Sequence, residues 1–193
     1  MITKKHRFQA SSPRNAEGFT LIEVMISMVV LTIGLLSLLG VFGMAMASTQ
    51  TSQQNGVAKQ LANEAIEGIL TARQTTNVTW DQIQNTGSGG IFIGGLNPIY
   101  NPGNDGIPDT ADDSSAGYQT LQLPGPDGIF GTSDDVSQPL SNYQRQIQID
   151  QVLDGAGTPI GTLRLVTITI QYTTPQFRFP KTYILSTYIS EYR

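Results

Sequence analysis

The sequence predicts an α+β protein, in which one long N-terminal helix, membrane-spanning in its first half, packs on a C-terminal antiparallel β-sheet. Three observations predict this class: an almost unbroken apolar run after residue 18, an amphipathic continuation of that run, and alternating apolar and polar residues near the C-terminus. The 193 residues leave room for one such helix and one modest globular domain. We expect a leader peptide at 1–18, a transmembrane helix at 19–48, its amphipathic continuation at 49–73, a loop-rich region at 74–142 and a β-sheet at 143–193.

The apolar run extends from Phe19 to Ala47. Its length, about 28 residues, exceeds the roughly 20 that span a bilayer. A buried helix of a soluble protein would not be apolar on all sides, and the apolar core of a secretory signal peptide is only about 7–15 residues long. Basic residues precede the run, so we expect a single-pass protein whose N-terminus stays cytoplasmic. These basic residues are Lys4, Lys5, Arg7 and Arg14.

One carboxylate, Glu23, interrupts the apolar run. A charge at the centre of a membrane helix costs about 2.5–3.5 kcal/mol, but Glu23 would lie near the cytoplasmic interface, where the cost is lower. Two interpretations are open. Glu23 either has a specific partner or is an interfacial carboxylate that reaches the headgroups and has no further role.

The run Gly18-Phe19-Thr20-Leu21-Ile22-Glu23-Val24, with a basic leader before it and a membrane helix after it, resembles the N-terminus of the type IV pilin superfamily. This superfamily includes pilins, minor pilins and the pseudopilins of type II secretion, and the segment as a whole looks most like the PilV-type minor pilins. The resemblance covers about the first third of the chain. It implies a prepilin that a prepilin peptidase and methyltransferase cleaves after Gly18 and methylates on Phe19.

The same resemblance implies where the protein resides and what it contacts. The subunit would be held in the inner membrane and then assembled, by the pilus assembly machinery and with other pilin subunits, into a filament at the cell surface. Glu23 would pair with the N-terminal amine of a neighbouring subunit. At 4 Å such a pair gains about 4 kcal/mol of gross attraction at an effective dielectric constant of 20, and desolvation offsets much of it. We therefore expect Glu23 to set register and recruitment.

Composition excludes several other functions. The chain has a net charge of −4 and a basic leader, so the remainder is acidic and is not expected to bind nucleic acid. It has no cysteine, and its single histidine, His6, lies in the leader. The mature chain therefore lacks the residues for a Ser-His-Asp triad or a usual zinc site, and we expect no enzyme.

These observations favour a structural subunit of a type IV pilus, a minor pilin involved in filament assembly and priming. Two alternatives within the superfamily are a major pilin and a type II secretion pseudopilin. An alternative of another class is a membrane protein with one spanning helix, whose extracytoplasmic head binds a ligand.

The second half of the helix and the C-terminal strands are predicted to pack together. A stripe of apolar residues recurs at helical spacing after Ser48–Asn55, and strands are expected at Tyr143–Leu153, Thr162–Tyr172 and Lys181–Ser190. The stripe consists of Val57, Ala58, Leu61, Ala62, Ala65, Ile66, Ile69 and Leu70. It would cover one face of an antiparallel meander. Between helix and sheet, we expect Trp80 to anchor the loop region and Ile91–Ile93 to form a short strand.

The loop region contains an internal repeat. Asn101–Asp113 aligns with Leu123–Asp135, 22 residues further on, and each copy has an Asp-Gly turn followed by an Asp-Asp pair. Oxygen ligands on glycine-containing loops suit Ca²⁺, although the spacing is not that of an EF-hand. The alternative is a solvated acidic turn that was duplicated. The candidate ligands are Asp105, Asp109, Asp112, Asp113, Asp127, Asp134 and Asp135; we expect no other cofactor.

Overall fold

The computed structural model of the chain describes residues 18–174 and 179–192. The basic leader predicted at 1–17 lies outside the described residues. The chain divides into two compact units, Met1–Met46 and Ala47–Arg193, and each is described by itself below.

A single helix, α1 (Leu21–Gln74), contributes to both units. It is 54 residues long. In the first unit, all its residues up to Met46 are exposed, so no other described part of that unit covers the apolar run. In the second unit, one side of α1 is buried, and near its C-terminal end Arg73 donates a hydrogen bond to the carbonyl oxygen of Ser190.

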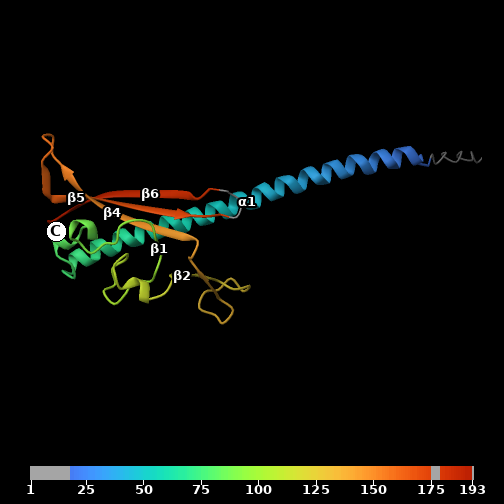
Figure 1. Ribbon diagram of the computed structural model, residues 1–193. Helices are drawn as coiled ribbons and strands as arrows, with labels where there is room; N and C mark the ends of the chain where they lie inside the picture. The colour runs from blue at the N-terminus through green and yellow to red at the C-terminus, as the bar shows by residue number, and fades with distance from the viewer. Residues whose placement is uncertain (1–17, 175–178, 193) are drawn as a thin grey trace, which may run out of the picture. The chain divides into compact units, whose positions relative to one another are not determined.

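The second unit is built on a four-stranded antiparallel sheet in the order β1-β4-β5-β6. Its strands are β1 (Asn97–Pro98), β4 (Tyr143–Leu153), β5 (Pro159–Tyr172) and β6 (Lys181–Ser190). Figure 1 shows the long strands of this sheet running along the second half of α1. The loop region between helix and sheet adds a two-stranded hairpin and three short 3-10 helices. These elements are β2 (Thr120–Leu123), β3 (Val136–Pro139), η1 (Trp80–Gln82), η2 (Thr86–Ser88) and η3 (Asp113–Ser115).

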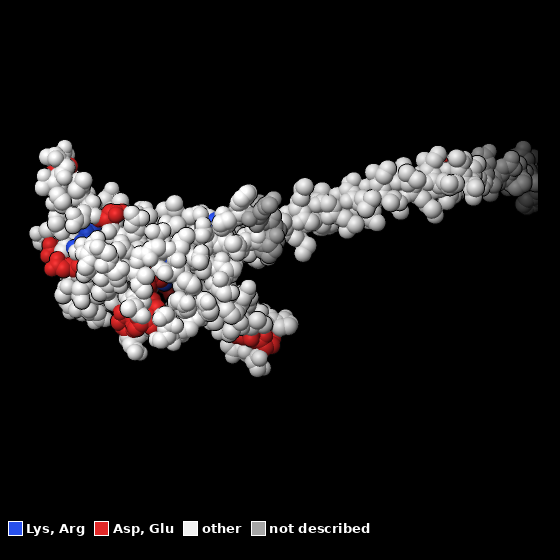
Figure 2. Space-filling view, in the orientation of Figure 1, with Lys and Arg blue, Asp and Glu red and all other residues white. Residues whose placement is uncertain are grey.

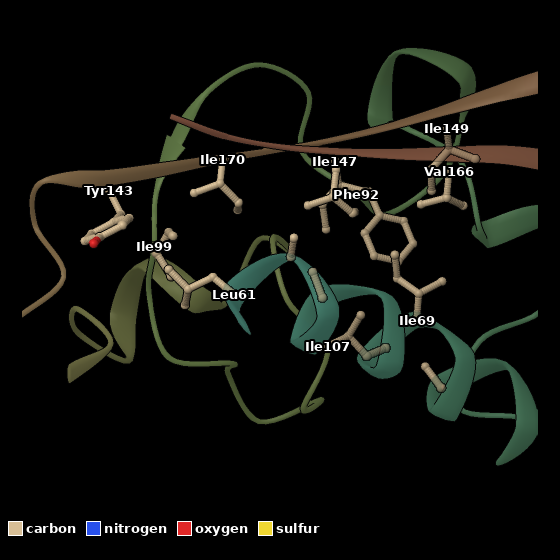
Figure 3. Packing of buried hydrophobic residues seen from close by; sticks show 14 of the residues in the cluster. Leu61, Ile69, Phe92, Ile99, Ile107, Tyr143, Ile147, Ile149, Val166 and Ile170 are labelled. Atoms are coloured by element: carbon tan, nitrogen blue, oxygen red, sulfur yellow. The ribbon is translucent and has the colours of Figure 1, made fainter. Parts of the chain in front are cut away.

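The core of this unit lies between α1 and the inner face of the sheet (Figure 3). Small residues of α1 let the helix approach the sheet closely, while branched side chains of β4 and β5 fill the space between them. Fully burying a side chain such as Ile168, which has no exposed surface, contributes about 1.5–3 kcal/mol. The helix supplies Ala58, Leu61, Ala62, Ala65, Ile69 and Ala72; the two strands supply Tyr143, Ile147, Ile149, Val166, Ile168, Ile170 and Tyr172.

The predicted fold class is confirmed: a long N-terminal apolar helix packs, in its second half, against a C-terminal antiparallel sheet. The predicted anchoring by Trp80 is also confirmed, because its indole N–H donates to the carbonyl oxygen of Gly161 at 2.7 Å and Arg164 lies over its ring at 4.7 Å. The short strand predicted at Ile91–Ile93 is wrong. Phe92 forms only an isolated bridge with Asn85, and its side chain is fully buried in the core.

Candidate functional site

The N-terminal motif lies at the start of α1. Gly18 and Phe19 precede the helix, and Phe19 is 82% exposed. Glu23 lies in the first turn of α1, where its charge interacts favourably with the positive end of the helix dipole. The backbone N–H of Glu23 donates to the hydroxyl of Thr20 at 3.3 Å. Thr20 and Glu23 have the spacing of a capping box, and this hydrogen bond to Thr20 is one of the two that such a box contains.

The apolar part of α1 has the properties of a membrane span. Its most apolar 18-residue window has a mean hydropathy of 2.5 and contains no buried residue. Within the described residues, α1 is the one helix that is long and apolar enough to cross a bilayer, judged by length and composition.

Residues 13–39 match the family model of the prokaryotic N-terminal methylation motif. The chain therefore carries the N-terminal methylation motif of the type IV pilin and pseudopilin superfamily and is a pilin-like or pseudopilin-like prepilin. The matched segment includes Gly18, Phe19 and Glu23 but nothing of the second unit, and it does not distinguish a PilV-type minor pilin from other members. No curated protein and no solved structure matched the chain.

The two copies of the acidic repeat fold in the same way. We call residues 102–113 turn 1 and residues 124–135 turn 2. In turn 1 the Asp105 carboxylate accepts from the N–H of Ile107 at 2.8 Å, and in turn 2 Asp127 accepts from Ile129 at 2.8 Å. The glycines after these aspartates, Gly106 and Gly128, have φ of 69° and 70°, a left-handed conformation that glycine adopts without strain.

A threonine hydroxyl lies at the centre of each turn. In turn 1 the Thr110 hydroxyl is 2.8–3.3 Å from four oxygens, which belong to the carboxylates of Asp105, Asp112 and Asp113 and the carbonyl of Ile107. One hydroxyl hydrogen cannot serve four acceptors at once, and backbone N–H groups also donate to the carboxylates of the three aspartates. One carboxylate oxygen from each of the three aspartates lies within 4.8 Å of the other two. In turn 2 the Thr132 hydroxyl lies 2.6–3.4 Å from three oxygens, which belong to the carbonyl of Ile129 and the carboxylates of Asp134 and Asp135. Asp127, the counterpart of Asp105, is not among its partners.

Hydrogen bonding and burial shift the pKa values of these carboxyls in opposite directions. The Thr110 hydroxyl lowers the pKa of Asp112, and the Thr132 hydroxyl lowers that of Asp134. Burial raises the pKa of Asp113. The ionised forms of Asp112 and Asp134 therefore stabilise the fold above the ordinary carboxyl pKa, and this contribution is lost as the pH falls through their lowered values. Asp113 acts in the opposite sense, because its ionised form is disfavoured in the folded state.

The two turns differ in their surroundings. Turn 1 is packed into the second unit, where Ile107 is 3% exposed and joins the core beside α1 (Figure 3). Asp109 forms a buried, two-pronged ion pair with Arg145 of β4, with N–O distances of 3.0 and 3.1 Å. Turn 2 lies at the end of the β2–β3 hairpin, and Figure 2 shows its acidic surface on a separate protrusion.

Of the predicted ligands, the structure brings Asp105, Asp112 and Asp113 together in one group of carboxylates. In turn 2, Asp134 and Asp135 share the Thr132 hydroxyl, whereas the Asp127 carboxylate accepts from the N–H of Ile129 and is not grouped with them. Both carboxylate oxygens of Asp109 accept from Arg145, and Gly131 takes the equivalent place in turn 2. Calcium binding by these clusters stays a prediction. Sequence reasoning missed Thr110, Thr132 and Arg145, although both threonines recur in register in the repeat.

The calcium prediction is tested by thermal unfolding of the full chain in detergent. If the turns bind Ca²⁺ with a Kd of about 10⁻⁴–10⁻³ M, a concentration ten times Kd stabilises the fold by about 1.4 kcal/mol. The melting temperature should then rise with millimolar Ca²⁺ and fall back with chelator.

The double variant Asp127→Ala with Asp134→Ala should remove the part of the calcium-dependent rise in melting temperature that comes from turn 2. The double variant Asp105→Asn with Asp112→Asn should remove the part that comes from turn 1. Asp150→Asn, an exposed carboxylate on β4 outside both turns, is the matched control. A melting temperature that responds to neither calcium nor chelator would identify both clusters as solvated acidic turns.

Proposed function

We propose that this chain is a structural subunit of a type IV pilus, a minor pilin that takes part in filament assembly and priming. It is made as a prepilin with a leader at residues 1–18, held in the inner membrane, cleaved after Gly18 and N-methylated on Phe19. Residues 19–48 then form the filament core, while the amphipathic continuation at 49–73, the loop region at 74–142 and the sheet at 143–193 form the outward-facing head.

The observation that carries this proposal is the exposure of the entire apolar part of α1 directly after the motif. From Leu21 to Met46 no described residue is covered by another part of its unit. A long apolar surface of this kind has to be covered by lipid or by equivalent helices. A pilin occupies both environments, first the membrane and then the filament.

The motif residues support specific roles in this cycle. Gly18 lies where a peptidase must bring its own backbone and side chains close, and no heavy atom lies within 4 Å of the position that a Cβ would take. Phe19 provides the amine that cleavage frees. Glu23, one helical turn further on, provides the carboxylate that pairs with this amine in a neighbouring subunit.

Mass spectrometry of the mature N-terminus tests the proposal. We expect a chain that begins at Phe19 and carries one N-methyl group. Gly18→Val should block cleavage, because the branched side chain obstructs the approach of the peptidase, while Gly18→Ala should cause a smaller loss. An intact leader in the wild-type protein, or a cut after the apolar run, would contradict the proposal.

The assignment as a minor pilin rests on the resemblance of the whole N-terminal segment to PilV-type minor pilins. The abundance of the protein in filaments distinguishes this assignment from its alternatives. A minor pilin should be a small fraction of the protein in sheared filaments, a major pilin should dominate them, and a pseudopilin should depend on a type II secretion system. A membrane protein with a ligand-binding head would retain its leader and stay out of filaments altogether.

A further inference from the structure

The second unit contains two glycines of α1, Gly56 and Gly68, and only one of them is covered. The ring of Pro108 in turn 1 lies directly over Gly68, because a Cβ built there would be 2.9 Å from Cδ of the proline. Over Gly56 nothing lies within 4 Å of the equivalent position. Glycine in a helix interior costs about 1 kcal/mol relative to alanine. At Gly68 this cost is offset by the close approach of turn 1, and at Gly56 no contact within the described chain offsets it.

Turn 2 has the apolar side chains for such a contact, but in its own chain these side chains are exposed. Ile107 and Pro108 of turn 1, both buried, correspond in the repeat to Ile129 and Phe130. These two side chains are 61% and 65% exposed. Turn 1 therefore packs on a helix glycine, whereas turn 2, which has a similar fold, leaves the equivalent side chains exposed.

The surface around Gly56 is open and partly apolar. Gly56 and Gln60 border two shallow grooves. One groove has a volume of about 470 Å³. Val57, Leu121 and Leu123 belong to its apolar part, and glutamine and asparagine side chains form most of the remainder. The other contains Lys59, one helical turn from Gly56, and Glu64 and Glu67 at its far end.

Charge orients turn 2 on this surface. Among the described residues Lys59 has no ion-pair partner, and turn 2 has three carboxylates. Attraction to Lys59 and repulsion from Glu64 and Glu67 both favour the end of the groove at Gly56.

We propose that turn 2 of one copy docks on Gly56 of a second copy of this chain, with Phe130 in the apolar groove and the carboxylates of turn 2 beside Lys59. This contact rests on the proposed function, because filament assembly brings the heads of neighbouring subunits side by side. It adds that copies of this minor pilin are neighbours of one another in the filament. The tip and the groove are different surfaces of each copy. The contact is therefore heterologous, and each copy uses its tip on one neighbour and its groove on another.

Disulfide crosslinking of the full chain tests the contact, since the wild-type sequence contains no cysteine. Ser133→Cys in turn 2 is combined with Gln60→Cys at the groove, and oxidised whole cells that carry their filaments are run on non-reducing gels. We expect a ladder of dimers, trimers and higher species, because each copy has one cysteine on either side of the contact.

Three further variants make the test specific. Phe130→Ser removes the apolar anchor, and Gly56→Leu fills the open position; both should abolish the ladder. Gly56→Leu should leave the fold intact, because the site is open and leucine favours a helix. Ser133→Cys with Gln148→Cys, on an exposed residue of the sheet, is the control for random collision and should give no ladder.

Crosslinking equal to that control, closed dimers without higher species, a disulfide within one chain, or a ladder that persists in Gly56→Leu would each overturn the proposed contact. The mature N-terminus is measured in the same samples. A normal N-terminus without a ladder rejects the contact alone, whereas a ladder with an intact leader rejects the pilin function alone.

Discussion

Replacing Asp109 with asparagine is expected to lower the free energy of unfolding of the second unit by about 3–5 kcal/mol, the typical cost of removing one partner of a buried ion pair. The loss arises because Arg145 is only 1% exposed and would keep its charge without a counterion. A domain of this size is usually stable by about 5–15 kcal/mol, so the variant would lose a large part of its stability. Asparagine is chosen because Asp109 has φ of 60°, which asparagine tolerates better than most residues.

Urea unfolding of the full chain in detergent measures this effect, with fluorescence of the single tryptophan, Trp80, as the signal. The double variant Asp109→Asn with Arg145→Met should recover much of the loss, because an apolar side chain of similar length replaces the unpaired cation. Asp150→Asn should leave stability within about 0.5 kcal/mol of wild type. If Asp109→Asn is no less stable than Asp150→Asn, the ion pair does not fasten turn 1 to the sheet.

Replacing Glu23 is expected to abolish most incorporation into filaments while leaving membrane insertion intact or improved. Removing a charge from an apolar helix favours the bilayer, but the amine of a neighbouring Phe19 then loses its counterion among packed apolar helices. The measurement compares the variant with wild type in the membrane fraction and in sheared filaments from the same cells.

Two substitutions separate the charge of Glu23 from its position in the first turn of α1. Glutamine completes a capping box as glutamate does, whereas alanine does not. Glu23→Gln should therefore be as defective as Glu23→Ala if the ion pair matters. Normal incorporation of Glu23→Gln beside a defective Glu23→Ala would assign the residue to helix capping instead.

The regular elements were predictable because their periodicity is strong. Strands β4 and β6 begin and end at the predicted residues, and β5 begins three residues earlier than Thr162, at Pro159. The β2–β3 hairpin was missed, because strands as short as Thr120–Leu123 carry too little alternation to stand out from a loop. The triplet Ile91–Ile93 predicts a strand, but an apolar triplet does not reveal whether its burial comes from strand pairing or from side-chain packing, and Phe92 is buried by packing.

The candidate site was predictable where it depends on local sequence and not where it depends on contacts distant in the chain. The repeat indicates two similar turns, and the Asp-Gly pair in each copy indicates where the chain turns tightly. Nothing in the repeat showed that Asp109 would pair with Arg145, 36 residues away, or that Pro108 would cover Gly68. These contacts follow from the packing of turn 1 against helix and sheet, which local pattern does not encode.

The unequal burial of the two turns has a consequence for how this chain can diverge. Substitutions in turn 1 require compensating substitutions in the core, because Ile107 belongs to that core and Pro108 packs on Gly68 of α1. Turn 2 is free of that requirement, since Ile129 and Phe130 are exposed and do not belong to the core; the constraint proposed for it is the contact with a neighbouring copy. The repeat thus contains one copy that the core constrains and one that it does not, so substitutions at the tip of the β2–β3 hairpin are expected to alter contacts with partners without unfolding the chain.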